Sequence, residues 1–346
     1  MKATDIVTLK DIASMEVNAK GRFYSATDQE IKQGLTSDIY FVRTRDLLGS
    51  LDLAETEVTA EVFSSKDGVL AGMDEAIHLL YNRNLEIWSL PEGSEISARE
   101  VVMRIKGRYC DFGVFETPLL GMLASSSGWA TAARTCKEAA GDKTLVCYGA
   151  RHLHPSAAPV MERAAVIGGA DACSCILGAL LLGRAPVGTI PHAAFLIVGD
   201  TVELAKAYDR FVAEDDPRII LVDTFKDETE EALRVAEALG DRLNGIRLDT
   251  PGERGGVTAG LVRETRARLN QSGFGDVQIV VSGGLKPERI TELAEAGADA
   301  FGVGSYIARS PAIDMTMDLK EVNGKAVAKR GRIPGVTDNE RLVRVD

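Results

Sequence analysis

Apolar and polar residues follow two different patterns along the chain. Within residues 54–109, three segments alternate apolar and polar positions, which is typical of antiparallel strands with one face in solvent. Between them, residues 72–84 (GMDEAIHLLYNRN) have the spacing of an amphipathic helix. From Pro118 onward, short apolar runs alternate with long helical patterns. This change predicts a small α+β domain followed by repeated β/α units.

Seven short apolar runs are candidates for parallel strands. They are KTLVCYG (143–149), DACSCIL (171–177), APVGTI (185–190), RIILVDT (218–224), NGIRLDT (244–250), QIVVSGG (278–284) and DAFGVGS (299–305). Every run except the last precedes a helical or small-residue segment, and parallel strands need such crossovers. Seven such units point to a barrel or a doubly wound sheet. Of the two we predict an α/β fold with a C-terminal (β/α) barrel, of seven strands if every run forms one, and an N-terminal α+β domain.

The expected limits are residues 1–115 for the N-terminal domain, 116–320 for the barrel and 321–346 for a C-terminal tail. Asn323-Gly324 in the tail predicts a hairpin, because this dipeptide suits a tight two-residue turn.

Composition narrows the possible partners. The chain has 51 acidic and 40 basic residues, giving a formal net charge of -11, which argues against nucleic-acid or anionic-membrane binding. It contains no apolar stretch of about 20 residues that would span a membrane. The N-terminal stretch MKATDIVTLK lacks the long apolar core of a signal peptide. We therefore expect a cytoplasmic protein.

The cysteines do not indicate a metal site. No two of the five are spaced as Cys-x-x-Cys, so reduced thiols are expected. Cys173 and Cys175 could be metal ligands, but they lie in a run of small apolar residues, where cysteine packs as a compact hydrophobe. We expect no bound metal among them.

Polar side chains follow several of the predicted strands. In a barrel these positions converge on one mouth, where such enzymes carry their chemistry. Arginine pairs well with planar carboxylates and phosphates, and aspartate suits a divalent ion or sugar hydroxyls, although an aspartate can equally be a helix N-cap. The residues are Arg151, His152, His154, Thr189, His192, Asp223, Thr224, Arg247 and Asp249, including three of the chain's four histidines.

Two glycine turns follow the last two predicted strands, Ser282-Gly283-Gly284 and Gly302-Val303-Gly304-Ser305. Glycines at such positions allow backbone N–H groups to converge on an anion, and the following helix N-terminus favours negative charge. The alternative is that they only form tight turns. Two such turns at adjacent strand ends favour an anion site.

These motifs together resemble the nicotinate phosphoribosyltransferases. The resemblance is carried, in order, by TSDIYFVRTRDLL (36–48), YGARHLHP (148–155), GTIPHA (188–193), LVDTFKDETEEAL (221–233), GIRLDTPG (245–252), VSGGL (281–285) and FGVGS (301–305). It extends from Thr36 to Ala308. It implies synthesis of nicotinate mononucleotide from nicotinate and phosphoribosyl pyrophosphate in NAD biosynthesis, with Mg²⁺ and with ATP as a co-substrate.

The resemblance also implies roles for individual residues. His192 would carry a transient phosphate, Asp223 and Asp249 would face ribose, pyrophosphate and magnesium, and the two glycine turns would hold the 5-phosphate. Residues expected to contact substrate are Tyr40, Phe41, Arg151, His152, His154, Ser174, Thr189, Thr224 and Arg247. The 5-phosphate site would comprise Ser282, Gly283, Gly284, Gly302, Gly304 and Ser305.

Assembly follows from the same resemblance. A homodimer or a higher homo-oligomer is expected, in which Tyr40 and Phe41 reach the pyridine ring of the partner, although an aromatic pair near a helix can also be core packing. Some compact relatives carry a C-terminal cysteine knuckle for zinc. This chain lacks it, so no zinc is expected.

Three alternatives stay open from the sequence. A related quinolinate phosphoribosyltransferase would share both glycine turns, but such enzymes typically carry a Thr-Arg-Lys-Thr stretch where this chain reads AARTCKEAAGDKT (132–144), so nicotinate is predicted. A catalytically silent barrel that binds a phosphorylated ligand is the second. A phosphoribosyltransferase for another aromatic acid is the third.

Overall fold

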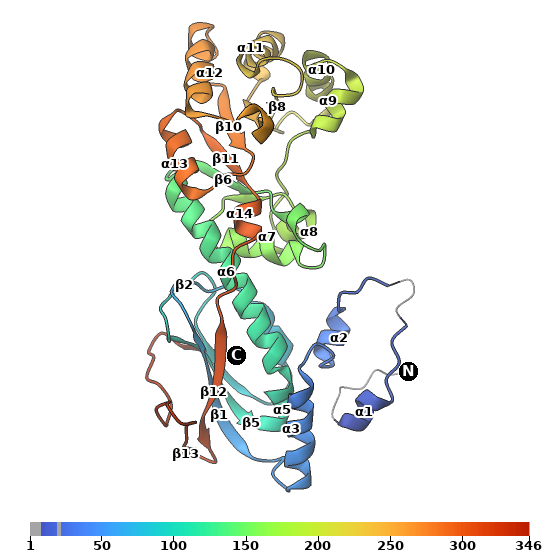
Figure 1. The fold of residues 1–346 in the computed structure, drawn as a ribbon, viewed down its shortest axis with the longest axis vertical. Coiled ribbons are helices and arrows are strands. Elements are labelled where there is room, and N and C mark those ends of the chain that lie inside the picture. Colours follow the sequence, from blue (N-terminus) through green and yellow to red (C-terminus); the bar gives the residue numbers. More distant parts are fainter. Residues whose placement is uncertain (1–7, 19–21, 346) are drawn as a thin grey trace. The chain divides into compact units, whose positions relative to one another are not determined.

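The computed structural model describes residues 8–18 and 22–345 and forms two compact units. The first unit comprises Met1–Thr131 and Pro311–Asp346, and the second comprises Ala132–Ser310 (Figure 1). The second unit is thus inserted into the first. Residues 1–7 of the stretch examined for a signal peptide lie outside the described residues.

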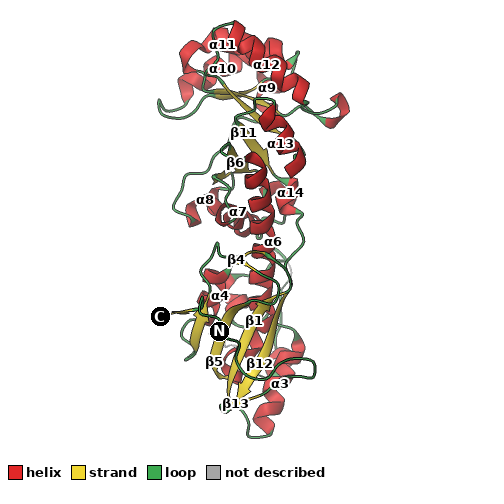
Figure 2. Ribbon diagram, turned by 90° about the vertical axis from the view of Figure 1, so that its left-hand side faces the viewer, coloured by secondary structure: helices red, strands yellow, loops and turns green. Residues whose placement is uncertain are grey.

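The first unit contains an antiparallel sheet in the order β13-β12-β1-β5-β3-β14, whose strands lie side by side in Figure 2. The strands of this sheet are β1 (Glu57–Ser64), β3 (Glu86–Ser89), β5 (Val101–Arg108), β12 (Met315–Val322), β13 (Lys325–Ala326) and β14 (Val343–Val345). A second, two-stranded sheet pairs β2 (Gly68–Val69) with β4 (Glu95–Ile96). Asn323 and Gly324 both have positive φ between β12 and β13, as a tight hairpin turn requires.

Helices of the first unit bury one face in a common core. α4 (Met73–Leu80) buries four apolar positions at helical spacing, Met73, Ala76, Leu79 and Leu80. They join Phe112 and Phe115, which are nearly inaccessible, in the core. The other helices are α1 (Leu9–Ala13), α2 (Asp28–Lys32), α3 (Ile39–Ser50), α5 (Tyr109–Phe112) and the start of α6 (Glu116–Ala140).

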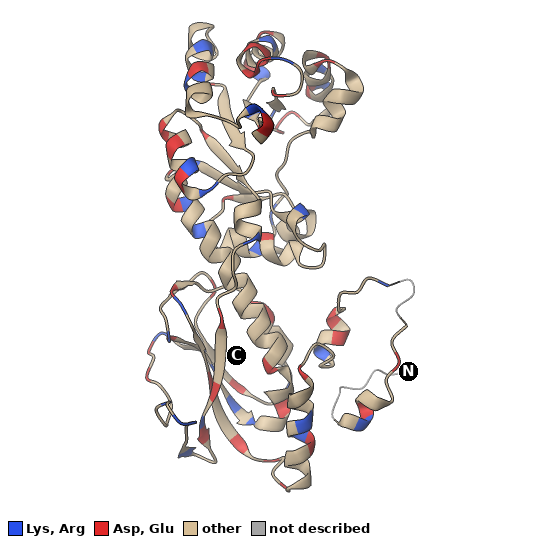
Figure 3. Ribbon diagram, viewed as in Figure 1, with Lys and Arg blue, Asp and Glu red and all other residues tan. Residues whose placement is uncertain are grey.

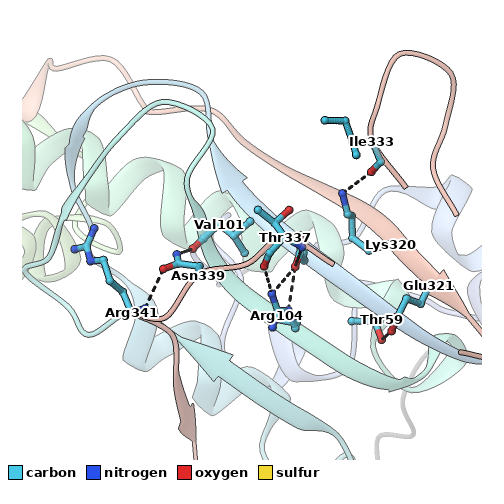
Figure 4. Close-up of polar contacts among 10 residues, drawn as sticks. Thr59, Val101, Arg104, Lys320, Glu321, Ile333, Thr337, Asn339 and Arg341 are labelled. Atoms are coloured by element: carbon cyan, nitrogen blue, oxygen red, sulfur yellow. Dashed lines mark hydrogen bonds and ion pairs between the residues drawn. The ribbon is translucent and has the colours of Figure 1, made fainter. Parts of the chain in front are cut away.

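The second face of β1 is covered by the C-terminal segment, contrary to the half-exposed pattern expected there. Glu61 is buried although it alternates with the core residues Ala60 and Val62. Its carboxylate accepts hydrogen bonds from the Arg104 guanidinium at 2.7 and 2.9 Å and from the backbone N–H of Thr337 at 3.0 Å; Figure 4 labels the two donor residues. Asn339 donates to the Val101 carbonyl at 2.9 Å. These contacts fix the segment against the sheet.

The second unit contains a parallel sheet in the order β7-β6-β11-β10-β9-β8. Its strands are β6 (Thr144–Cys147), β7 (Ala172–Cys173), β8 (Ile219–Leu221), β9 (Gly245–Leu248), β10 (Gln278–Ser282) and β11 (Ala300–Val303). β10 and β11 are buried at nearly every position, as expected when helices cover both faces of a parallel sheet. The predicted α/β class with an N-terminal α+β domain is confirmed.

Helices connect the strands of this sheet. α11 (Glu228–Leu239) begins at an N-cap, where the Asp227 side chain accepts from two backbone N–H groups, and it buries Ala232, Val235 and Ala236. α13 (Pro287–Glu295) has proline at its first position, where the missing N–H costs nothing. The remaining helices are the end of α6, α7 (Ala158–Ile167), α8 (Ile176–Leu181), α9 (His192–Val198), α10 (Thr201–Phe211), α12 (Ala259–Gln271) and α14 (Ser305–Ala308).

The sheet does not close into a barrel, and the predicted strand at 185–190 does not form. Only the Val187 N–H makes a strand-like bond there, to the Cys173 carbonyl at 2.9 Å. Pro186 and Pro191 lack the N–H groups that a ladder needs, and Gly188 is a weak strand residue. Six strands therefore stand where seven were expected, with β7 and β8 at the two edges.

Charged residues of both signs lie along the helices of the second unit. Acidic and basic positions are mixed along α12 and α13 (Figure 3). Among the described residues, no helix combines the length and apolar character needed to cross a membrane.

Candidate active site

The predicted strand-end residues of the second unit lie at one edge of its sheet. Parallel strands end at the same edge, so the loops that follow them converge there. The ends of β9, β10 and β11 and the loops after β8, β9, β10 and β11 bring acids, an arginine, a serine and two glycine turns to this edge.

Arg247 is the centre of the polar contacts at this edge. Its Nε donates to Ser282 Oγ at 2.8 Å, and its Nη1 donates to Thr189 Oγ1 at 2.9 Å. Its Nη2 lies 3.6 Å from Asp249 Oδ2, while Ser282 Oγ donates to Asp249 Oδ1 at 2.8 Å. The guanidinium also lies over the Tyr148 ring, 4.9 Å from its centroid. Arg247 is thus held rigidly with a positive charge facing the edge.

Asp223 and His192 form a second polar group. His192 Nε2 lies 2.9 Å from Asp223 Oδ2, and the Asp223 side chain is only 2% exposed. Burial raises the pKa of Asp223 above its ordinary value, while the hydrogen bond and charge of His192 oppose that shift. Asp223 Oδ1 and Thr224 Oγ1 are buried without a hydrogen-bond partner. Such unsatisfied atoms at a strand end indicate a place where a ligand completes the bonding.

The first glycine turn borders a cavity of about 390 Å³. Gly283 and Gly284 both have positive φ, at 96° and 61°, which glycine adopts without strain. The cavity is also lined by Gly255 and Gly256 of the loop after β9, by Lys286 and Arg289 at the start of α13, and by Glu288 and Glu292, of which Glu292 pairs with Arg289. Small residues and two cations around an open volume suit a phosphate group.

The second glycine turn packs tightly against the loop after β6. A Cβ at Gly302 would collide with the Tyr148 ring, and one at Gly304 would lie 2.5 Å from the Tyr148 carbonyl oxygen. The same Gly304 Cβ would lie 3.1 Å from His152 Nε2. Burial, Arg151 and Arg309 lower the pKa of His152. This places His152 beside the turn, with Ser305 as the first residue of α14.

Other predicted residues are placed less centrally. Ser174 follows β7 and is held by hydrogen bonds from its N–H and hydroxyl to Glu162. His154 accepts from the Ser156 N–H within its own turn at 3.2 Å. In the first unit, Tyr40 is 54% exposed while Phe41 is buried in the core, with ring centroids 4.2 Å apart. Phe41 therefore has a packing role.

Sequence reasoning did not single out two residues that organise this edge. The Tyr148 ring lies beneath the Arg247 guanidinium, Tyr148 packs against Gly302 and Gly304 of the second turn, and Glu162 of α7 joins two loops. Glu162 is fully buried although glutamate in a helix is usually exposed, so helical periodicity gave no signal for it.

A divalent ion could be held by two carboxylates of this edge. Asp223 offers an unpartnered oxygen, and Asp249 is 26% exposed. In the described part of the chain, no cluster of three or more histidine, cysteine, aspartate or glutamate side chains could hold a metal. The donor set fits Mg²⁺ that arrives with substrate oxygens as further ligands.

Two protein-family models match the chain in the order of its sequence. The model described as quinolinate phosphoribosyl transferase, N-terminal domain, matches residues 38–127, and the model of the C-terminal domain matches residues 129–318. The chain therefore belongs to the quinolinate phosphoribosyl transferase family. The expected resemblance to the nicotinate and quinolinate phosphoribosyltransferases is confirmed.

The individual relatives carry two different enzyme names. A crystal structure of nicotinate-nucleotide pyrophosphorylase from Pyrococcus furiosus is 44% identical, with a TM-score of 0.87, over 91% of this chain and 82% of that chain. Nicotinate phosphoribosyltransferase pncB2 of Mycobacterium tuberculosis is 30% identical over 70% of this chain and 53% of its own length. A protein of Methanothermobacter thermautotrophicus named "Probable nicotinate-nucleotide pyrophosphorylase (carboxylating)" is 26% identical over 77% of this chain and 89% of its own length. The chain spans about half the length of the first curated relatives it matches.

These comparisons correct the prediction of a nicotinate phosphoribosyltransferase. Both domain models are those of the quinolinate enzyme, and the structure that is 44% identical is a nicotinate-nucleotide pyrophosphorylase. The prediction relied on the stretch 132–144. That stretch forms the end of α6 and the turn into β6, so it meets the sheet at the edge opposite the candidate site. Its residues therefore say little about which acid is bound.

Proposed function

We propose that this protein is a quinolinate phosphoribosyltransferase, which transfers the phosphoribosyl group of phosphoribosyl pyrophosphate to quinolinate and releases pyrophosphate and carbon dioxide. The match to both quinolinate phosphoribosyl transferase domain models carries the proposal. The name of the Pyrococcus relative describes the same chemistry in reverse, because pyrophosphorolysis of the nucleotide undoes the transfer. The carboxylating direction named for the Methanothermobacter relative restores the second carboxylate.

The reaction makes limited demands on a protein. The pyridine nitrogen forms a bond to ribose C1 while the C1–O bond breaks, and pyrophosphate leaves with the electron pair of that bond. The carboxylate beside the ring nitrogen then leaves as carbon dioxide, and a proton from solvent takes its place. Because positive charge develops at C1 and negative charge on the leaving group, placement and electrostatic stabilisation supply most of the catalysis.

The residues of the edge divide these tasks. The two glycine turns bind the 5-phosphate through backbone N–H groups. Arg151 and Arg247 supply positive charge for the two carboxylates of quinolinate, and His152 offers a hydrogen bond beside the second glycine turn. Asp249 faces the ribose, and with Asp223 it holds Mg²⁺ that enters bound to the pyrophosphate. His192, paired with Asp223, donates a hydrogen bond to the leaving group.

Assembly into a homodimer or larger homo-oligomer is part of this proposal. α8 exposes Ile176, Leu177, Leu180 and Leu181 at 53–67%, and α9 exposes Ile197 at 85%. Clustered apolar side chains of this size favour burial against another chain. A second copy is the occupant we propose, and the mass of the purified protein in solution measures it.

The decisive experiment offers one pyridine acid at a time. Purified protein with Mg²⁺ and phosphoribosyl pyrophosphate should convert quinolinate to nicotinate mononucleotide with carbon dioxide release, as read by product mass. Asp249→Asn serves as the matched control for contaminating activity and should lose about 100-fold in rate. Turnover of nicotinate without turnover of quinolinate would overturn the proposal.

Repeating the assay with and without ATP tests the earlier prediction that ATP is a co-substrate. A phosphate carried on His192 would appear as an acid-labile label from γ-labelled ATP. Without that label, His192 keeps only the hydrogen-bonding role.

A further inference from the structure

Glu162 is a fully buried carboxylate on α7 that joins the loops after β6 and β7. Its Oε1 accepts from the Ala150 N–H at 2.9 Å and from the Ser174 hydroxyl at 3.2 Å. Its Oε2 accepts from the Ser174 N–H at 2.8 Å and from the Cys175 N–H. One side chain thus satisfies three backbone donors on two different loops.

The ability of Glu162 to hold both loops depends on its charged carboxylate more than on the volume of its side chain. A buried carboxylate is costly unless several donors compensate it, and those described here are three amides and a hydroxyl. Both oxygens act as acceptors from opposite sides. A glutamine would turn an NH₂ group toward either Ala150 or the pair Ser174 and Cys175, so one set of donors would lose its partner.

The loop held by Glu162 at Ala150 contacts the second glycine turn. Ala150 begins the short helix Ala150–His152, and His152 Nε2 lies 3.1 Å from where a Gly304 Cβ would stand. The Tyr148 N–H donates to the Val303 carbonyl at 2.8 Å, within that turn. Movement of this loop would therefore change the shape of the proposed phosphate site.

We propose that Glu162 is a positioning residue, which holds the Tyr148–His152 loop against the Gly302–Ser305 turn so that the turn binds the 5-phosphate. This inference rests on the proposed phosphoribosyl transfer for its kinetic consequence. Its structural consequence, the order of the loop, can be tested without any turnover.

Glu162→Gln is the test variant, and Asp299→Asn is its matched control. Asp299 also accepts a backbone N–H, from Ile279 at 2.8 Å, and pairs with Arg266, but it directly precedes β11, at the edge of the sheet away from the site. Glu162→Gln should raise KM for phosphoribosyl pyrophosphate about tenfold with a smaller change in kcat, whereas Asp299→Asn should lower thermal stability and leave KM within about twofold. Equal effects of both substitutions on KM would overturn the positioning role.

Two measurements on the resting protein separate this inference from the proposed function. Amide hydrogen exchange at Ala150, Ser174 and Cys175 should accelerate in Glu162→Gln and stay slow in Asp299→Asn. NMR titration should show the pKa of His152 rising toward its ordinary value as the loop is released, whereas loss of a nearby negative charge alone would lower it. If amide protection and the pKa of His152 in Glu162→Gln match those of the wild type, the inference is refuted, even when the enzyme is active. A wild type without turnover would refute only the function.

Discussion

Glu116, the first residue of α6, has a carboxyl group whose pKa is raised to about 7. Burial is the main cause, the Asp318 carboxylate adds to it, and Lys329 opposes it. In the unfolded chain this carboxyl ionises near its ordinary value of 4.5. Between these two pH values the folded state holds more protons than the unfolded state, so stability falls as pH rises through this window.

Glu116→Gln should remove this loss of stability. The variant should match the wild type at pH 4 and be more stable by about 2 kcal/mol at pH 8, because the buried group no longer ionises. Urea denaturation followed by tryptophan fluorescence measures this, since Trp88 and Trp129 both lie in the first unit. Glu340→Gln, at an exposed position in the same unit, is the control. A similar gain in both variants at pH 8 would show that burial of Glu116 is not the cause.

The sequence supports prediction of site residues that lie at the ends of strands or in the loops that follow them. Asp223, Arg247, Asp249 and Ser282 come together at one edge because the ends of parallel strands define it. Glu162 could not be found this way, because its role depends on the fully buried face of a helix. Phe41 was expected at a substrate and is in the core, since an aromatic residue on a helix gives the same sequence signal in either place.

At the level of elements, the two glycine turns need glycine for different reasons. Gly284 has positive φ and open space around its Cα, whereas Gly304 has ordinary φ and lies against the Tyr148 backbone. The first turn is therefore restricted by conformation and the second by close approach.

Gly304→Ala should destabilise the second unit by about 3 kcal/mol, because backbone atoms cannot move aside for the methyl group as a flexible side chain could. Gly284→Ala should cost about 1 kcal/mol, and Gly284→Asn less, since asparagine tolerates the left-handed region. Thermal unfolding by circular dichroism compares the three. The reverse order of stabilities would contradict this account of the turns.

At the run 185–190 and at β1, the periodicity of apolar residues was not enough to predict the structure correctly. The run at 185–190 looks like a strand by its apolar residues, but its prolines prevent pairing. The alternation in β1 correctly predicted a strand and wrongly predicted an exposed face, because the covering residues lie more than 270 positions later in the chain. Burial by residues so distant in the sequence leaves no pattern in the sequence of the strand itself.

At the scale of the whole molecule, the C-terminal segment completes the first unit. It supplies β14, which pairs with β3, and the Thr337 N–H on buried Glu61. The core of that unit therefore depends on residues from both ends of the chain.

Ending the chain after Val336 should lower the stability of the first unit by about 3 kcal/mol, since Glu61 loses a donor and β3 becomes an edge strand. Tryptophan fluorescence should report a lower urea midpoint, while amide protection in β10 of the second unit stays unchanged. Arg344→Ala, which removes an exposed ion pair with Glu86 and the contact of the guanidinium with the Trp88 ring, should change the midpoint little. An unaltered midpoint in the truncated chain would show that the segment does not stabilise the sheet.

The insertion of one unit into the other has a consequence for synthesis on the ribosome. Residues 132–310 are continuous, so the second unit can complete its fold as soon as it has emerged. The first unit has to wait for β12, which pairs with β1 across more than 250 intervening residues, and the Ile313 N–H then bonds to the Ala124 carbonyl. Nascent chains therefore carry an unfinished N-terminal sheet through most of translation. This reverses the usual order in which the N-terminal domain folds first, and it makes that sheet the part most in need of chaperone protection.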